Sequence, residues 1–113
     1  MITNTTKKFK IIDKAKPCTS IGSKALGMMF RLKRPKEALI FIFDNEKRAD
    51  LHMLFVFFPI DVLFLDKDKK VVDIKKDFKP FTYYSPKAKA QYVIELPIGV
   101  MGSTRIGDKI KFN

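Results

Sequence analysis

Short apolar runs separated by polar turns recur along the 113-residue chain. The clearest runs cover residues 38–43, 51–58, 60–65 and 92–96 and are rich in Val, Ile, Leu and Phe. Runs of this length and composition favour strands, although periodicity alone does not separate a buried strand from a buried helix. Weaker alternation predicts further strands at residues 7–12 and 109–112, and the polar residues 66–70 predict a hairpin turn. The pattern therefore predicts a mainly β domain.

Turn-forming and helix-breaking residues divide these runs. We expect Pro17 to end the first strand and residues 44–47 to form a polar turn. Residues 19–26 begin with side chains that cap helices and are followed by a glycine, so a short helix is predicted there. Pro59 cannot donate to a sheet ladder and marks a bend, a bulge or an edge position. We expect a single domain over residues 1–113, a small barrel or sandwich of six to eight short strands with one or two short helices.

The composition limits the chemistry and the location of the protein. Cys18 is the only cysteine and His52 the only histidine, so an internal disulfide is impossible and no zinc-ligand spacing exists. The sequence has no Gly-rich phosphate loop and no Ser/His/Asp arrangement, and we expect no cofactor and no metal. The N-terminus lacks the apolar segment of a secretory signal, and the apolar run 53–65 is too short to cross a bilayer. These features predict a cytoplasmic protein without a membrane partner.

Charge is distributed unevenly along the chain, whose net charge is +11. Residues 1–36 hold ten Lys or Arg against one acid, whereas residues 37–66 carry more acids than bases. The densest basic cluster contains Arg31, Lys33, Arg34 and Lys36. This cluster is either an electrostatic footprint for nucleic acid or an ordinary lysine-rich surface in contact with solvent. The abundance of Lys and the single Gln also favour a heat-adapted source.

Four short elements, in this order, resemble those of one protein family. Residues 27–31 read Gly-Met-Met-Phe-Arg, residues 59–66 read Pro-Ile-Asp-Val-Leu-Phe-Leu-Asp, residues 92–97 read Tyr-Val-Ile-Glu-Leu-Pro, with a glycine at 99, and residues 107–108 read Gly-Asp. They are similar to elements of the domain of unknown function (DUF) 192 family. The resemblance implies a compact, mainly β fold with a short helix before residues 27–31, and it implies no established activity.

The chain departs from that family at one element. Many members read Phe-Trp-Met-Lys-Asn-Thr before the second element, whereas residues 51–56 here read Leu-His-Met-Leu-Phe-Val. His52 stands in the Trp position, and three apolar residues replace Lys-Asn-Thr. A polar site built by those three residues in other members is therefore not carried over to this chain.

Asp61 interrupts an apolar run, which makes it the first candidate for a site. A buried carboxylate must find a cation, accept backbone N–H groups or stay protonated. It is either an acid/base or ligand-binding group, or a structural acid that caps the turn at Pro59 or pairs with Arg31. We predict that Arg31 and Asp61 lie within salt-bridge distance or share one hydrogen-bond network, because the Arg fork suits a carboxylate.

Four further residues have both a functional and a structural interpretation. Glu95 either contributes to a site or faces solvent from the predicted strand 92–96. His52 is either a ligand contact or a hydrogen-bonded core residue. Tyr83 and Tyr84 lie in a long irregular stretch, and they either form a binding platform or pack that stretch against the domain.

Three functions are compatible with these residues. The first is a non-enzymatic binding module for a small polar molecule, with contacts from Arg31, His52, Asp61 and Glu95 and a flap formed by Tyr83 and Tyr84. The alternative is a nucleic-acid-binding protein that uses Arg31, Lys33, Arg34 and Lys36. The third is a hydrolase that works with carboxylates, since the chain offers one histidine and one cysteine.

Overall fold

The computed structural model describes residues 1–18, 37–47, 51–52, 59–79 and 82–112. In these ranges the chain forms ten strands and no helix, so the mainly β prediction is confirmed. The helix predicted at residues 19–26 lies outside the described residues. No helix in the ranges given is long and apolar enough to cross a membrane.

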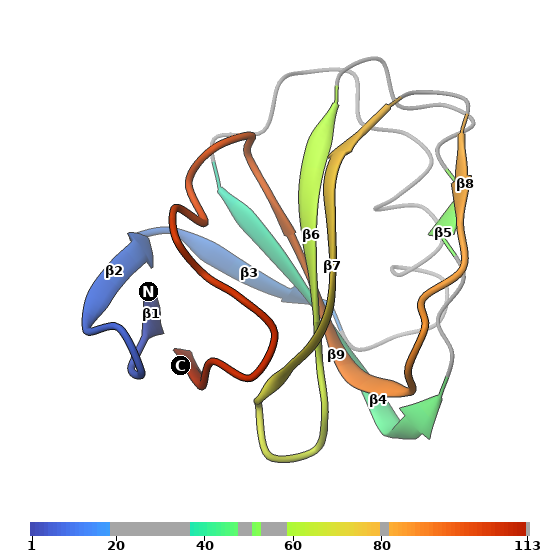
Figure 1. The fold of residues 1–113 in the computed structure, drawn as a ribbon, viewed down its shortest axis with the longest axis horizontal. Coiled ribbons are helices and arrows are strands. Elements are labelled where there is room, and N and C mark those ends of the chain that lie inside the picture. The colour runs from blue at the N-terminus through green and yellow to red at the C-terminus, as the bar shows by residue number, and fades with distance from the viewer. Residues whose placement is uncertain (19–36, 48–50, 53–58, 80–81, 113) are drawn as a thin grey trace.

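A five-stranded sheet forms the centre of the domain (Figure 1). Its strands, in spatial order, are β3 (Ala15–Cys18), β4 (Ala38–Lys47), β9 (Ala90–Leu96), β6 (Ile60–Leu65) and β7 (Val71–Phe78). The pairing of β3 with β4 is parallel, and the other three pairings are antiparallel. The strands β3 and β7 therefore lie at opposite edges of this sheet.

Two smaller sheets lie beside the central one. Strands β1 (Ile2–Asn4), β2 (Phe9–Ile12) and β10 (Ile110–Phe112) pair in the order β10-β1-β2, which brings the two ends of the chain together (Figure 1). Strand β5 (Leu51–His52) pairs with β8 (Tyr83–Tyr84) on the other side of the molecule. The central sheet is thus flanked on both sides.

Burial explains why the run in β6 is continuously apolar rather than alternating. All six residues of β6 are buried. Ile60, Val62 and Phe64 belong to one hydrophobic cluster, whereas Leu63 and Leu65 belong to a second. A strand that is covered on both faces needs apolar side chains at successive positions. Because side chains alternate along a strand, Asp61 lies on the same face of β6 as Leu63 and Leu65.

Two local predictions are wrong. Pro17 does not end a strand but lies within β3. Because β3 is an edge strand, the sheet tolerates a residue that has no backbone N–H to donate. Residues 44–47 do not form a turn but continue β4, whose register against β9 shifts between Ile42 and Lys47. The hairpin turn predicted at residues 66–70 is confirmed, because the N–H of Asp66 donates to the carbonyl oxygen of Lys70 at 2.9 Å.

Candidate functional site

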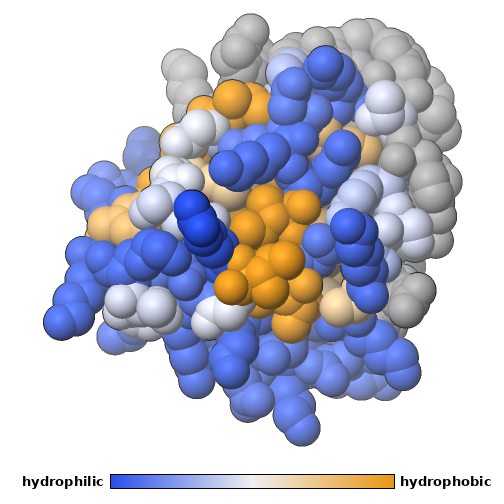
Figure 2. Space-filling view, in the orientation of Figure 1, coloured by the Kyte–Doolittle hydropathy of each residue, from blue (hydrophilic) through white to orange (hydrophobic). Residues whose placement is uncertain are grey.

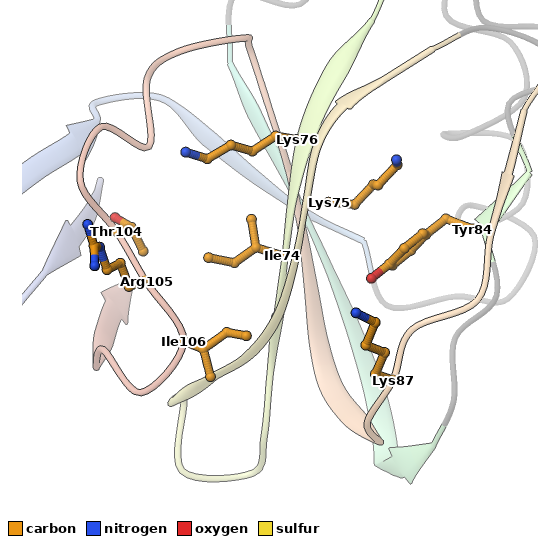
Figure 3. A pocket seen from close by; sticks show the side chains of 8 residues that line it. All are labelled: Ile74, Lys75, Lys76, Tyr84, Lys87, Thr104, Arg105 and Ile106. Atoms are coloured by element: carbon orange, nitrogen blue, oxygen red, sulfur yellow. The ribbon is translucent and has the colours of Figure 1, made fainter.

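An open groove of about 690 Å³ runs along the outer edge of β7. Its lining comes from β7, from residues 84–87 and from the loop that precedes β10: Ile74, Lys75, Lys76, Tyr84, Lys87, Thr104, Arg105 and Ile106. Figure 2 shows an apolar patch surrounded by hydrophilic residues on this face of the molecule. Figure 3 shows Lys75, Tyr84 and Lys87 on one side of β7, and Ile74 and Lys76 on the other with residues 104–106.

Asp73 holds the first wall of the groove. Asp73 as a whole residue is 4% exposed, and its Oδ1 accepts the N–H of Ile74 at 2.8 Å. Oδ2 accepts the hydroxyl of Tyr84 at 2.7 Å and the backbone N–H of Lys87 at 2.9 Å. Because three donors from two segments converge on one carboxylate, Asp73 ties residues 84–87 to β7.

Tyr84 is a fixed part of that wall. Its ring centroid lies 5.8 Å from that of Phe64 and 6.4 Å from that of Phe78, and the Nζ of Lys75 lies 5.5 Å from the Tyr84 ring centroid. Burial, together with the hydrogen bond to Asp73, raises the pKa of Tyr84 to about 12. The phenol therefore stays protonated and remains a donor to Asp73.

Asp108 holds the second wall. Its Oδ2 accepts the Nδ2 of Asn4 at 2.9 Å and the backbone N–H of Arg105 at 3.0 Å, and it forms an ion pair with Lys7. These contacts lower the pKa of Asp108 to about 2. The hydrogen bond from the Lys7 ammonium has the largest effect, and the hydrogen bond from Asn4 has the second largest. The hydroxyl of Thr104 accepts the Nδ2 of Asn4 at 3.1 Å and donates to the carbonyl oxygen of Met101 at 2.7 Å. The 104–108 loop is thus anchored to β1.

The groove is strongly positive. Lys75, Lys76, Lys87 and Arg105 bring four cations to its lining, and none of them forms an ion pair within the part of the chain that the structure describes. Asp73, which lies in β7 beside the groove, already accepts hydrogen bonds from three donors. Ile106 is 64% exposed and leaves an apolar surface between the cations. The groove therefore combines positive potential with an apolar surface.

Asp61 is buried and holds backbone rather than a ligand. Its Oδ1 accepts the N–H of Asp77 at 2.8 Å, and its Oδ2 accepts the N–H of Gly99 at 2.9 Å. Both carboxylate oxygens thus join the end of β7 to the turn after β9, which favours the structural interpretation of this residue. Arg31 lies outside the described residues, so the Arg31–Asp61 pair stays a prediction.

Glu95 does not face solvent, and the solvent-facing interpretation is wrong. Its side chain is 1% exposed. In register it lies between Leu39 of β4 and Val62 of β6, both members of the first cluster. Asp61 instead pairs with Leu96, on the opposite face of the sheet. The structure therefore does not bring Glu95 and Asp61 together in one cavity.

The remaining predicted residues are only partly described. The backbones of His52 and Tyr83 pair with each other in β5 and β8, and their side chains lie outside the description. The basic cluster also lies outside it: Arg31, Lys33, Arg34 and Lys36. Tyr84 is the predicted residue that the structure places in the groove. Within the described ranges, no group of three His, Cys, Asp or Glu residues is arranged to hold a metal ion.

Sequence reasoning missed most of the groove. Asp73 could have been found from the sequence, because it is a carboxylate among the apolar residues Val71, Val72 and Ile74. Asp61 was recognised by the same kind of position within an apolar run. The cations offered none, because lysines are spread along the whole chain and their convergence depends on how β7 packs against two distant loops.

Comparison with known proteins identifies the family. The model of the DUF192 family, described as "Uncharacterized ACR", matches residues 2–112. The chain belongs to the DUF192 family. A UPF0127 protein of Pyrococcus horikoshii is 41% identical and covers 99% of this chain and 98% of its own. A UPF0127 protein of Pyrococcus furiosus is 37% identical, and the match covers 97% of this chain and 96% of that protein. Both relatives come from thermophilic archaea, in line with the composition.

A solved structure confirms the fold of this DUF192 chain. A protein of unknown function from Novosphingobium aromaticivorans superposes with a TM-score of 0.83 at 22% identity, over 98% of this chain and 81% of that one. At this identity the likeness shows the fold alone.

Among the described residues, the elements that resemble the DUF192 pattern have structural roles in this chain. Asp61, from the second element, accepts the N–H of Gly99, which follows the third element and has a φ of 86°. Asp108, from the closing Gly-Asp element, holds the 104–108 loop, and the N–H of the preceding Gly107 donates to the carbonyl oxygen of Val71 at 2.8 Å. These elements thus position the loops that surround β7.

Proposed function

We propose that this protein is a non-enzymatic binding module that holds a negatively charged ligand with an apolar part in the β7 groove. The single observation that carries the proposal is the convergence of four cations around Ile74 and Ile106. A groove with one sign of charge attracts ligands of the opposite sign, and an apolar surface between the charges adds contact area. We further propose that the protein works in the cytoplasm, in line with its single cysteine.

The two carboxylate networks support a binding site rather than an accidental hollow. Asp73 fixes the wall that carries Tyr84 and Lys87, and Asp108 fixes the wall that carries Arg105. Walls that are already in place lower the entropy lost when a ligand is ordered. Asp73 and Asp108 are both buried and hold these walls instead of pairing with the groove cations.

Isothermal titration calorimetry with three probes tests the proposal. Phenyl phosphate carries both charge and an apolar ring, inorganic phosphate carries charge alone, and benzyl alcohol carries the ring alone. We expect phenyl phosphate to bind more tightly than either of the others, and its affinity to fall as salt rises. Equal binding of phenyl phosphate and benzyl alcohol would show that the cations do not contribute.

Charge-reversal variants locate the binding. Lys75→Glu and Lys87→Glu each place an acid at the groove, and we expect each to weaken phenyl phosphate binding by about tenfold, which is about 1.4 kcal/mol. Lys16→Glu is the matched control, because Lys16 is exposed on β3 at the opposite edge of the same sheet. If Lys16→Glu weakens binding as much as the groove variants do, the effect is one of net charge and the groove is not the site.

A further inference from the structure

The groove straddles the free edge of a β-sheet. β7 is the last strand of the central sheet, with β6 as its neighbour on one side. Ile74 packs against the cluster on one face of that sheet, whereas Tyr84 packs against the cluster on the other face. The two walls of the groove therefore lie on opposite faces, and the backbone edge of β7 runs between them (Figure 3).

At the start of this edge, residues 107–109 of the same chain already form backbone hydrogen bonds with β7. The N–H of Val71 donates to the carbonyl oxygen of Asp108 at 2.9 Å, and the carbonyl oxygen of Val71 accepts the N–H of Gly107 at 2.8 Å. Lys70 and Lys109 also form an antiparallel β-bridge. Residues 107–109 thus act as a short added strand, and the chain leaves the edge where the groove begins.

Beyond Val71 the same edge points into the groove. Val71 faces outward and pairs with Leu65, and Ile74 pairs with Leu63, two positions along β6, so the backbone of Ile74 faces outward as well. The N–H of Ile74 donates to the Asp73 side chain at 2.8 Å. Backbone groups alternate in direction along a strand, which turns the N–H and carbonyl oxygen of Lys76 the same way. Among the strands that the structure describes, only β6 pairs with this stretch, and it lies on the other side of β7. The carbonyl oxygen of Ile74 and both backbone groups of Lys76 are therefore positioned for a further strand.

The charges on this edge decide which strand fits. Lysines and bulges at a sheet edge oppose pairing with a second copy of the same edge. β7 has both, since its register against β6 shifts twice, and Lys75 precedes the second shift while Lys76 lies within it. The same cations, with Lys87 and Arg105 on the walls, attract an acidic chain. Nucleic acid fits less well, because the Tyr84 ring is packed against Phe64 and Phe78 and lies beneath the Lys75 ammonium.

We propose that the ligand of this groove is an extended, acidic peptide segment that adds to the β7 edge as a strand. The inference rests on the proposed function and names its ligand class. Main-chain hydrogen bonds to Ile74 and Lys76 hold the peptide, its acidic side chains reach the four cations, and its apolar side chains contact Ile74 and Ile106.

Fluorescence anisotropy with labelled peptides tests this inference. The probe is an end-blocked peptide of four glutamates alternating with three valines, and its partner is the same peptide N-methylated at the central residues. Both carry the same charge and side chains, but the second lacks the N–H groups that a strand donates. We expect the first to bind and the second to bind at least about tenfold more weakly, the loss of a few main-chain hydrogen bonds.

A pair of variants tests the edge from the protein's side. Lys76→Ala removes the charge, and Lys76→Pro removes the charge and the outward N–H, which an edge strand tolerates. We expect Lys76→Pro to bind the acidic peptide about tenfold more weakly than Lys76→Ala, whereas the two variants bind phenyl phosphate equally. Circular dichroism and urea unfolding of both variants confirm that the fold is retained.

The outcomes separate the inference from the proposed function. Equal binding of the methylated and unmethylated peptides, with phenyl phosphate still bound in the groove, overturns strand addition and leaves an anion site. Tighter binding of a single-stranded oligothymidylate than of the acidic peptide overturns it in favour of nucleic acid. Failure of every anionic probe overturns both.

Discussion

Asp108 provides the sharpest test of how the groove is held together. Its carboxylate Oδ2 receives the Lys7 ammonium, the Asn4 amide and the Arg105 backbone N–H. Asp108→Asn keeps the size and one oxygen acceptor of the side chain but removes its charge. The substitution therefore isolates the charge-assisted part of the network, which links the groove loop to β1.

The magnitude follows from the pKa of Asp108. The contacts lower this pKa from 3.8 to about 2, and each pKa unit corresponds to about 1.4 kcal/mol. The native network thus stabilises the ionised form by about 2 kcal/mol. Because the folded pKa is the lower one, this stabilisation is present above about pH 4 and disappears as the pH falls towards 2. We expect Asp108→Asn to lower the free energy of unfolding by about 2 kcal/mol at pH 7.

Urea unfolding between pH 7 and pH 2 measures this dependence, because guanidinium chloride would screen the ion pair. The difference between wild type and Asp108→Asn should shrink towards zero as the pH approaches 2. Asp68→Asn is the control, since Asp68 is exposed in the hairpin turn, and it should stay within about 0.5 kcal/mol of wild type. A wild-type to Asp108→Asn difference that stays constant over the whole pH range would refute the assignment.

Three further predictions concern Tyr84, Asp61 and Gly99. In an absorbance titration of phenolate, one of the three tyrosines should ionise near pH 12, and Tyr84→Phe should remove that step. Asp61→Asn should destabilise the protein by about 2–4 kcal/mol in urea unfolding. The side-chain NH₂ group of Asn then faces the N–H of Asp77 or of Gly99, and that N–H loses its acceptor. An unchanged urea midpoint would contradict this. Gly99→Ala should cost about 1–2 kcal/mol by the same measurement, because Gly99 has a φ of 86°.

The parts of the fold that sequence analysis predicted are those with a strong local signal. The run at 60–65 is buried on both faces, so its apolar residues are continuous and β6 was found with its exact bounds. β1 has only three residues, too few for a period to show. β3 contains Pro17, a strand breaker whose effect vanishes at a sheet edge. β3 can therefore be recognised only from its pairing with β4 in the folded sheet.

The candidate site was less predictable for a physical reason. Its walls meet through side-chain carboxylates that reach across the sequence: Asp73 binds residues 14 positions away, and Asp108 binds Asn4 over 104 positions. Local patterns carry no record of such contacts. Asp61 was identified from its apolar surroundings, but those surroundings do not distinguish a carboxylate that binds a ligand from one that holds backbone N–H groups.

Binding of an anion in the β7 groove can be observed directly in the amide ¹⁵N–¹H spectrum of the protein titrated with phenyl phosphate. We expect the largest shift changes to fall on residues that line the groove, and to saturate together with one dissociation constant: Ile74, Lys75, Lys76, Lys87 and residues 104–106. Shift changes that concentrate on β3, at the opposite edge of the central sheet, or that grow linearly without saturation, would contradict an anion-binding groove at β7.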